Sequence, residues 1–373
     1  MNRDGCRLVV CAVVAAILCT SILSAPVNAG PSTALELAHS WGVQTIGADL
    51  VHALGNQGSA VKIGVIDSGI DYRHPELQAN YAGGWDFVNN DNDPLDDYGH
   101  GTEVAGIIGA ARDGVGLVGV APEAHLYAYK VFNSLGIGTY SNVIAALDRA
   151  VADRMDVVNL SFGSPGNPGR DLLDACDRAV SAGIVLVAAA GNYDGLVGTA
   201  DTIIYPAHYS SVIAVGATTM DDERADFSSI GSELDLVAPG VDIYTTTLSG
   251  GYTTVTGTSF SAPYVTGVAA LLIHDGFADV RGRLVSTASD LGAVGFDPFY
   301  GYGRVDVHPV TIPAPSAVVL VLIGLPLACR RRLCLTSGDF VRRGIMPSEC
   351  GGAAVGAKVK PAWGAVRAGS QLP

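Results

Sequence analysis

The stretch VKIGVIDSGI, residues 61–70, is a short β-branched apolar run that ends in an acidic residue and a Ser-Gly turn. Such a run predicts a buried strand, and similar runs recur along the chain between amphipathic helical patterns. Strands that are apolar on both faces need helices on both faces, which predicts an α/β fold of three layers around a mainly parallel, twisted sheet. The further predicted strands are HLYAYKVF (125–132), DVVNLSFG (156–163), IVLVAAAGN (184–192), SVIAVGATT (211–219) and LDLVAPG (234–240). The predicted helices are EVAGIIGA (103–110), SNVIAALDRAV (141–151), DLLDACDRAV (171–180) and SFSAPYVTGVAALLIH (259–274).

Polar residues close two of these strands. Asp67 ends the first and Asn192 ends IVLVAAAGN. Since functional groups gather at the carboxyl edge of a parallel sheet, both side chains are expected at one crevice.

The composition fits an exported globular protein. Of 373 residues, 49% are hydrophobic, enough for a substantial core, and the net charge of −14 conceals a split. Residues 30–329 carry 12 Lys and Arg against 33 Asp and Glu, whereas residues 330–373 carry 8 against 2. The acidic body argues against a nucleic-acid partner. Cys176 is the one cysteine of residues 30–328, and its helical pattern predicts a small buried apolar residue.

The N-terminus has the pattern of a signal peptide over residues 1–29. Arg3 and Arg7 precede or flank an apolar run, and small residues lead up to Ala29. The alternative is that this segment is not cleaved and anchors the protein in the membrane. Residues 30–40 are then an N-terminal extension that leaves no room for a prodomain, so that folding without one or inhibition by a separate chain is expected.

Three residues together suggest acyl-transfer chemistry. Asp67 is expected to hold a carboxylate in a fixed place, and His100 opens HGTEVAG between two glycines. Ser259 lies in GTSFSAP at the mouth of a helix. A serine hydroxyl needs an adjacent base, which His100 would supply while Asp67 orients it. The Asn192 amide with the Ser259 N–H would form an oxyanion hole.

In the order Asp, His, Asn, Ser, these motifs resemble the subtilisin-like serine protease family. The resemblance covers about residues 40 to 307, through VIDSGIDYRHPEL, YGHGTEVAGIIGA, NLSFG, AAAGN and GTSFSAPYVTGVAALL. It implies a peptidase domain at 41–310 and a secreted endopeptidase that acts on protein or peptide substrates. A catalytically silent surface protein that binds peptides in the same groove is the alternative function.

The resemblance also implies a groove that binds the substrate backbone as an added strand. Its residues would be Ser161, Phe162, Gly163, Ala188, Ala189, Ala190, Gly191 and Ile204. Ile203 and Ile204 stand where a small residue is frequent in the family. We therefore expect a shallow primary pocket that favours small or medium apolar side chains.

Structural calcium is the cofactor that the resemblance implies. The loop AARDGVGLVGVAP resembles the family's tight calcium loop, with Asp113 and Glu76 as carboxylate ligands, but no N-terminal ligand is evident near Leu37. Asp86, Asp91 and Asp93 resemble a second, thermitase-type site; a solvated acidic loop is the alternative. The GxGxxG match at 114–119 follows a helix instead of a strand, which argues against a dinucleotide.

The C-terminal region changes character after residue 310. Within residues 311–332, a Pro-Ala-Pro turn, an apolar run and three arginines partly resemble bacterial PEP-CTERM sorting signals. Contact with a sorting enzyme or membrane, and thus an envelope location, is expected from this segment, with a plain disordered tail as the alternative. Residues 333–373 are expected to be disordered.

Overall fold

The computed structural model describes residues 31–192 and 201–307, with side chains from residue 35, and these residues belong to one compact unit. In chain order its first elements are α2 (Pro31–His39), α3 (Trp41–Thr45), α4 (Ala48–Ala53), β1 (Lys62–Asp67), α5 (Pro75–Gln78), β2 (Tyr81–Asp86), α6 (His100–Gly109), β3 (His125–Lys130), α7 (Tyr140–Asp153) and β4 (Val157–Leu160). There follow α8 (Arg170–Ser181), β5 (Val185–Ala189), β6 (Ile213–Thr218), β7 (Leu234–Pro239), β8 (Ile243–Thr247), η1 (Leu248–Gly250), β9 (Gly251–Val255), η2 (Thr258–Phe260), α9 (Ala262–His274) and α10 (Val280–Thr287).

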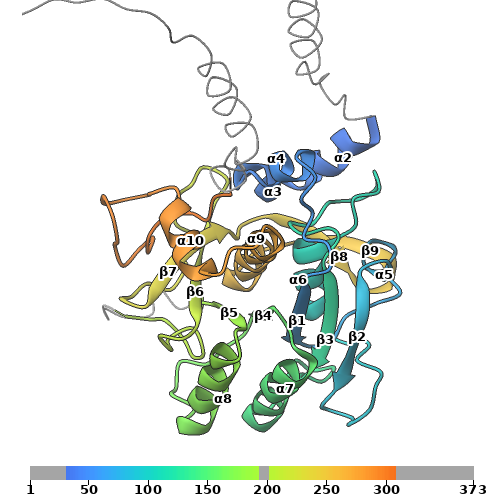
Figure 1. The fold of residues 1–373 in the computed structure, drawn as a ribbon, viewed down its shortest axis with the longest axis vertical. Helices are drawn as coiled ribbons and strands as arrows, with labels where there is room; N and C mark the ends of the chain where they lie inside the picture. Colours follow the sequence, from blue (N-terminus) through green and yellow to red (C-terminus); the bar gives the residue numbers. More distant parts are fainter. Residues whose placement is uncertain (1–30, 193–200, 308–373) are drawn as a thin grey trace, which may run out of the picture. The chain divides into compact units, whose positions relative to one another are not determined.

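The central sheet has seven strands in the order β2-β3-β1-β4-β5-β6-β7, and every pair is parallel. From β1 the chain builds outward to β3 and β2 on one side and to β4 through β7 on the other (Figure 1). The strand order therefore reverses beside β1, and the carboxyl ends of β1 and β4 flank the crevice where such sheets bind ligands.

Helices cover both faces of this sheet, as the continuous apolar strands predict (Figure 1). One buried cluster unites side chains of α6 and α9, such as Val104 and Val268, with Ile63 of β1. The other cluster unites α7 and α8, such as Leu147 and Leu172, with the opposite face of the sheet. The predicted three-layer α/β fold is confirmed.

The structure adds elements that the apolar pattern does not indicate. Strand β2 contains Gly83 and Gly84, both at positive φ, and a Cβ on Gly84 would lie 1.9 Å from the Ala128 carbonyl oxygen. This close approach requires glycine and hides the strand from pattern analysis. The hairpin β8–β9 is antiparallel and separate from the main sheet.

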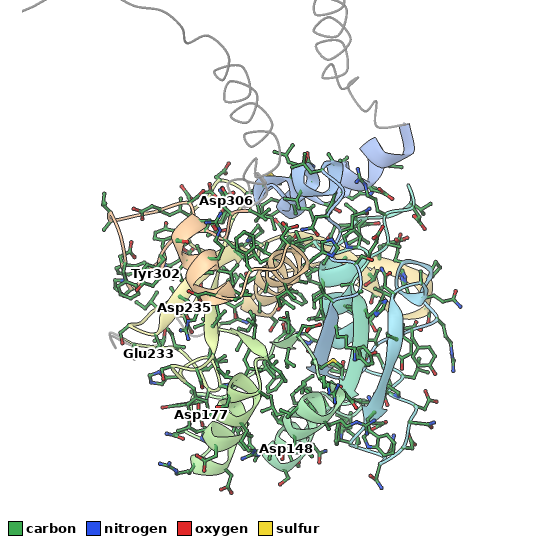
Figure 2. The ribbon with its side chains drawn as sticks, viewed as in Figure 1. Asp148, Asp177, Glu233, Asp235, Tyr302 and Asp306 are labelled. Atoms are coloured by element: carbon green, nitrogen blue, oxygen red, sulfur yellow. The ribbon has the colours of Figure 1, made fainter. Side chains whose placement is uncertain are left out.

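The folded region begins before Trp41, because Glu36 and Ser40 are buried. Among the described residues no helix is both long and apolar enough to cross a bilayer. Part of the negative charge lies on outer surfaces, as with Asp148 of α7 and Asp177 of α8 (Figure 2). Asp148 pairs with Arg178 at 2.7 Å across the two helices.

Candidate active site

Asp67 and His100 meet where β1 ends and α6 begins. His100 Nδ1 lies 2.8 Å from Asp67 Oδ1 and 3.0 Å from Oδ2. Ser68 N–H donates to Asp67 Oδ1 (2.7 Å), and Gly101 N–H donates to Ser68 Oγ (2.9 Å). A Cβ on Gly101 would lie 2.1 Å from the Gly69 carbonyl oxygen, so glycine lets the helix start against the turn. The carboxylate is buried, and 23% of the imidazole surface remains exposed.

Opposing influences set the pKa of His100. Burial lowers the pKa, whereas the charge of Asp67 and its hydrogen bond raise it, with smaller contributions from Glu103 and Asp96. The acidic neighbours outweigh burial, so the pKa of His100 lies above its ordinary value of 6.5. This site stabilises an imidazolium once a proton has been taken up.

Ser259 lies in η2, at the entrance to α9. In this structure its Oγ donates to the Ser161 carbonyl (2.9 Å), while Ser161 Oγ donates to the Ser259 carbonyl (2.7 Å). Ser161 Oγ also accepts from Asn159 Nδ2 (2.8 Å), and Asn159 Oδ1 accepts from Thr266 Oγ1 (2.9 Å). This relay joins β4, η2 and α9, and it fixes the serine backbone at the carboxyl edge of the sheet.

The amide of Asn192 has a defined orientation although the residue is exposed. Its Oδ1 accepts from Thr258 N–H (3.0 Å) and from Thr258 Oγ1 (2.9 Å). Thr258 Oγ1 in turn accepts from Gly191 N–H (3.1 Å). Because Oδ1 is held, Nδ2 is the amide atom free to donate to a bound group.

One cavity of about 970 Å³ brings these parts together. Asp67, His100, Asn192 and Ser259 line it, with the predicted groove residues Ser161, Phe162, Gly163, Ala189, Gly191 and Ile204. Aromatic and apolar side chains also line it, among them Phe132, Tyr140 and Val143.

Two predicted groove residues do not line this cavity. Ala188 and Ala190 are fully buried, and their place in the substrate groove stays a prediction. Side chains alternate between the two faces of a strand, so only Ala189 of this run reaches the cavity. The Ala190 backbone is also engaged: its N–H donates to the Val215 carbonyl, and its carbonyl accepts from Ile204 N–H (both 2.9 Å).

Ile204 packs tightly between the two strand ends that border the cavity. Its side-chain carbons lie 2.5 Å from the position of a Cβ on Gly163 and 2.9 Å from that of a Cβ on Gly191. The side chain therefore occupies space that a smaller residue would leave open.

A buried lysine beneath the site escaped the sequence analysis. Lys130, the last residue of β3, donates from Nζ to the carbonyls of Ser68 (2.6 Å) and Phe132 (3.0 Å) and pairs with Asp97. It links the turn after Asp67 to the cavity wall. The signal in the sequence that could have identified it is a lysine at the end of a largely apolar strand.

The predicted calcium loop contains a carboxylate that sequence reasoning missed. Glu36 lies one residue before Leu37, and its Oε1 accepts from Gly114 N–H. Glu36 Oε2 and Glu76 Oε2 are buried without hydrogen-bond partners. Burial raises the pKa of Glu76 to about 7, and the charges of Asp113 and Glu36 add to this effect, although a hydrogen bond from Tyr252 opposes it. Burial also raises the pKa of Glu36.

The carboxylates of the second predicted calcium site make hydrogen bonds within the protein. Both Asp86 oxygens accept hydrogen bonds from Asn89, and Oδ1 also accepts from Val88 N–H. Asp93 Oδ1 instead accepts from Tyr72 Oη (2.6 Å). The carboxylates of Asp86 and Asp93 therefore have different hydrogen-bond partners, and the calcium site that they would form with Asp91 stays a prediction.

Cys176 is buried in α8, and burial raises the pKa of its thiol to about 12, which agrees with the predicted apolar role. The signal peptide at 1–29, the sorting-like segment at 311–332 and the tail at 333–373 lie outside the described residues.

Comparisons with known proteins agree with this geometry. The model of the Subtilase family matches residues 58–303. Subtilisin NAT of Bacillus subtilis subsp. natto is 47% identical over 273 residues, which are 72% of this chain and 70% of the relative. Subtilisin DY of Bacillus licheniformis is 45% identical over 273 residues, 72% of this chain and 97% of its own length. Subtilisin Savinase of Lederbergia lenta is 40% identical over 275 residues, 73% of this chain and 98% of its own length.

Proposed function

This chain belongs to the subtilase family and is a serine endopeptidase, and we propose that Asp67, His100 and Ser259 form its catalytic triad. The observation that carries this assignment is the Asp67–His100 pair at 2.8 Å in the same cavity as Ser259. When substrate binds, Ser259 Oγ gives up its hydrogen bond to the Ser161 carbonyl and donates to His100 Nε2 instead.

His100 then takes the serine proton as Oγ attacks the scissile carbonyl, and the carboxylate of Asp67 stabilises the imidazolium. Collapse of the tetrahedral intermediate breaks the C–N bond, and His100 returns the proton to the leaving amine. Water hydrolyses the acyl-enzyme by the same steps in reverse. Asn192 Nδ2 and the Ser259 N–H donate to the oxyanion; the support for this role is that Thr258 holds Asn192 Oδ1 away from it.

The substrate backbone binds along the edge at Ser161–Gly163, opposite Ala189 and Gly191, as an added strand. The primary pocket favours small or medium apolar side chains because Ile204 fills the space between Gly163 and Gly191. Profiling with a peptide library tests this preference. Ile204→Ala should raise kcat/KM for Phe and Tyr at the cleavage position relative to Ala, whereas efficient cleavage after Phe by the unmutated enzyme would contradict it.

Glu36, Glu76 and Asp113 would hold calcium as the structural cofactor of this enzyme. The residues fit a hard cation: Glu36 Oε2 and Glu76 Oε2 are buried and unpartnered, and the loop at Asp113 carries several carbonyl groups. A bound Ca²⁺ would supply the positive charge that offsets these carboxylates, and the three ligands would then join α2 to the loop after α6.

Residues 1–29 direct secretion, and residues 311–332 contact a sorting enzyme or membrane during delivery to the envelope. The support is the order of charged, apolar and small residues in each segment. Sequencing the N-terminus of exported protein tests cleavage after Ala29. Envelope association should be lost when residues 311–332 are deleted.

The central test is labelling of the full chain with a fluorophosphonate probe, in calcium and in chelator. Ser259→Ala should abolish labelling, and its matched control, Ser261→Ala, should retain it because that buried hydroxyl has no hydrogen-bond partner among the described residues. Failure of a demonstrably folded sample to react would favour the silent peptide binder. Loss of labelling in chelator would support structural calcium.

A further inference from the structure

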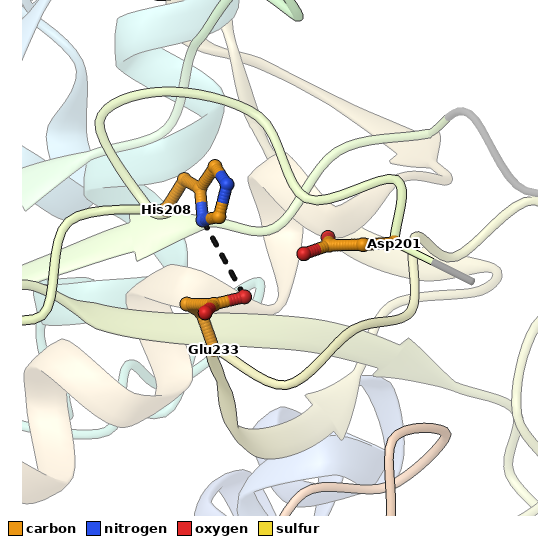
Figure 3. A group of neighbouring side chains, drawn as sticks. All are labelled: Asp201, His208 and Glu233. Atoms are coloured by element: carbon orange, nitrogen blue, oxygen red, sulfur yellow. Dashed lines mark ion pairs between the residues drawn. The ribbon is translucent and has the colours of Figure 1, made fainter. Parts of the chain in front are cut away.

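A cluster of metal-ligating side chains lies outside the catalytic crevice. Asp201, His208 and Glu233 each offer one ligand atom, and the three atoms lie within 4.8 Å of one another. Figure 3 shows the three side chains converging from separate segments of the chain. It is the one group of three such residues within 31–192 and 201–307 that meets this distance.

The backbone around Asp201 is fastened to the segment that leads to Glu233. Thr202 N–H donates to the Ile230 carbonyl (2.8 Å), and Ile230 N–H donates to Thr202 Oγ1 (3.0 Å). A Cβ on Gly231 would lie 2.4 Å from Asp201 Oδ1, so glycine lets the carboxylate approach this segment closely. Two of the three ligands therefore come from backbones that are already joined.

The imidazole and the second carboxylate are also oriented. The ring of His208 lies 4.8 Å from that of Tyr205, centroid to centroid. Ser232 Oγ donates to Glu233 Oε2 (2.8 Å). Such supporting contacts are the means by which proteins orient metal ligands before a metal binds.

The contact between His208 and Glu233 has the spacing of two ligands of one ion. His208 Nδ1 lies 3.4 Å from Glu233 Oε2, makes no hydrogen bond and is shielded from solvent. A charged hydrogen bond would be about 2.8 Å long. Two ligands at about 2.05 Å from a tetrahedral zinc ion lie about 3.3 Å apart, close to the distance between these atoms.

We propose that Asp201, His208 and Glu233 bind a divalent transition-metal ion of the Zn²⁺ class, with solvent in the fourth position. An imidazole nitrogen with two carboxylates suits Zn²⁺, whereas Ca²⁺ takes six to eight oxygen ligands. The site is separate from the catalytic triad and from the calcium loop of Glu36 and Glu76. Asp201 is exposed, and its Oδ1 accepts from Ile203 N–H (3.1 Å), which orients the carboxylate.

Metal at this site would strengthen the base of the primary pocket. His208 N–H donates to the Ile204 carbonyl, and Ile204 N–H donates to the Ala190 carbonyl (both 2.9 Å). An ion that joins Asp201 and His208 to Glu233 therefore holds both ends of the segment that carries Ile204. We expect Zn²⁺ to stabilise the folded enzyme, because it binds the assembled site and not the unfolded chain.

The test is calorimetric titration of ZnCl₂ into the full chain carrying Ser259→Ala, in saturating Ca²⁺. The matched variant is His208→Lys, which places an ammonium group beside Glu233 and removes the imidazole ligand; Asp201→Asn is the second variant. The cysteines and the active-site residues that could also bind Zn²⁺ are the same in all three proteins. Their contribution to the heat of binding therefore cancels when the titrations are compared.

The parent should bind one more Zn²⁺ equivalent than His208→Lys, or bind it at least about tenfold more tightly, and Asp201→Asn should show the same loss. Zn²⁺ should also raise the midpoint of thermal unfolding of the parent more than that of either variant. Superimposable titrations of parent and His208→Lys would overturn the proposal and leave His208–Glu233 an ordinary polar contact.

Discussion

Replacing Ser161 with Ala removes one hydroxyl from the relay beneath Ser259. Ser161 Oγ accepts from Asn159 Nδ2 (2.8 Å) and donates to the Ser259 carbonyl (2.7 Å). Asn159 and Ser161 are almost completely buried, so solvent cannot replace the lost partner without entering the core. The substitution leaves one buried donor and one acceptor without this bond while the surrounding apolar packing is retained.

Each buried polar group left without a partner costs about 1–3 kcal/mol. The Asn159 amide bears most of this cost, because Ser259 is half-buried and its carbonyl is closer to solvent. We therefore expect Ser161→Ala to lower the free energy of unfolding by about 2–4 kcal/mol. This is a decrease of roughly 30- to 1000-fold in the ratio of folded to unfolded protein.

Urea unfolding in the Ser259→Ala background measures this change without self-digestion. With an m-value of about 3 kcal/mol/M, the midpoint should fall by about 1 M while m stays constant. Ser210→Ala is the control, since Ser210 is exposed and should change the free energy by less than about 0.5 kcal/mol. A midpoint for Ser161→Ala that matches this control would refute the assigned relay.

Three further predictions concern catalysis and calcium. Only neutral His100 accepts the serine proton, so kcat/KM should rise with pH, with a midpoint above 6.5. Glu103→Gln removes a negative charge that raises the pKa of His100, so this midpoint should move to lower pH. An unchanged midpoint would contradict the effect of the Glu103 charge on His100. Asn192→Ala should lower kcat about 100- to 1000-fold with little change in KM, a magnitude taken from subtilisin itself; steady-state kinetics that show only a KM effect would exclude the oxyanion role. Because the folded pKa of Glu76 is raised to about 7, its contribution to calcium-free stability is present below about pH 4.5 and is lost as the pH rises through about 7. Thermal unfolding in chelator should show this loss, Ca²⁺ should stabilise more at pH 8 than at pH 5, and Glu76→Gln should flatten the dependence.

The order of the buried strands could be read in part from the sequence, because apolar runs such as VKIGVID recur at intervals that fit helical crossovers. Strand β2 could not be read in this way. Its Gly83 and Gly84 carry no apolar pattern, and their need becomes evident only beside the Ala128 carbonyl of the neighbouring strand. The hairpin β8–β9 likewise gave no signal that separated it from the sheet.

The motifs predicted that Asp67, His100, Asn192 and Ser259 meet at one crevice, because each motif places a polar group at the end of a strand or the start of a helix, and the four residues do line one cavity. Only the tertiary structure shows which residues distant in sequence form hydrogen bonds around the two sites. Lys130 reaches Ser68 across 62 residues, and Glu36 reaches Gly114 across 78. It also placed Ala189, but not Ala188 or Ala190, at the cavity and gave Asp86 and Asp93 different partners. Local pattern fixes which backbone conformation a segment adopts, whereas hydrogen bonding and burial depend on segments distant in sequence that only folding brings together.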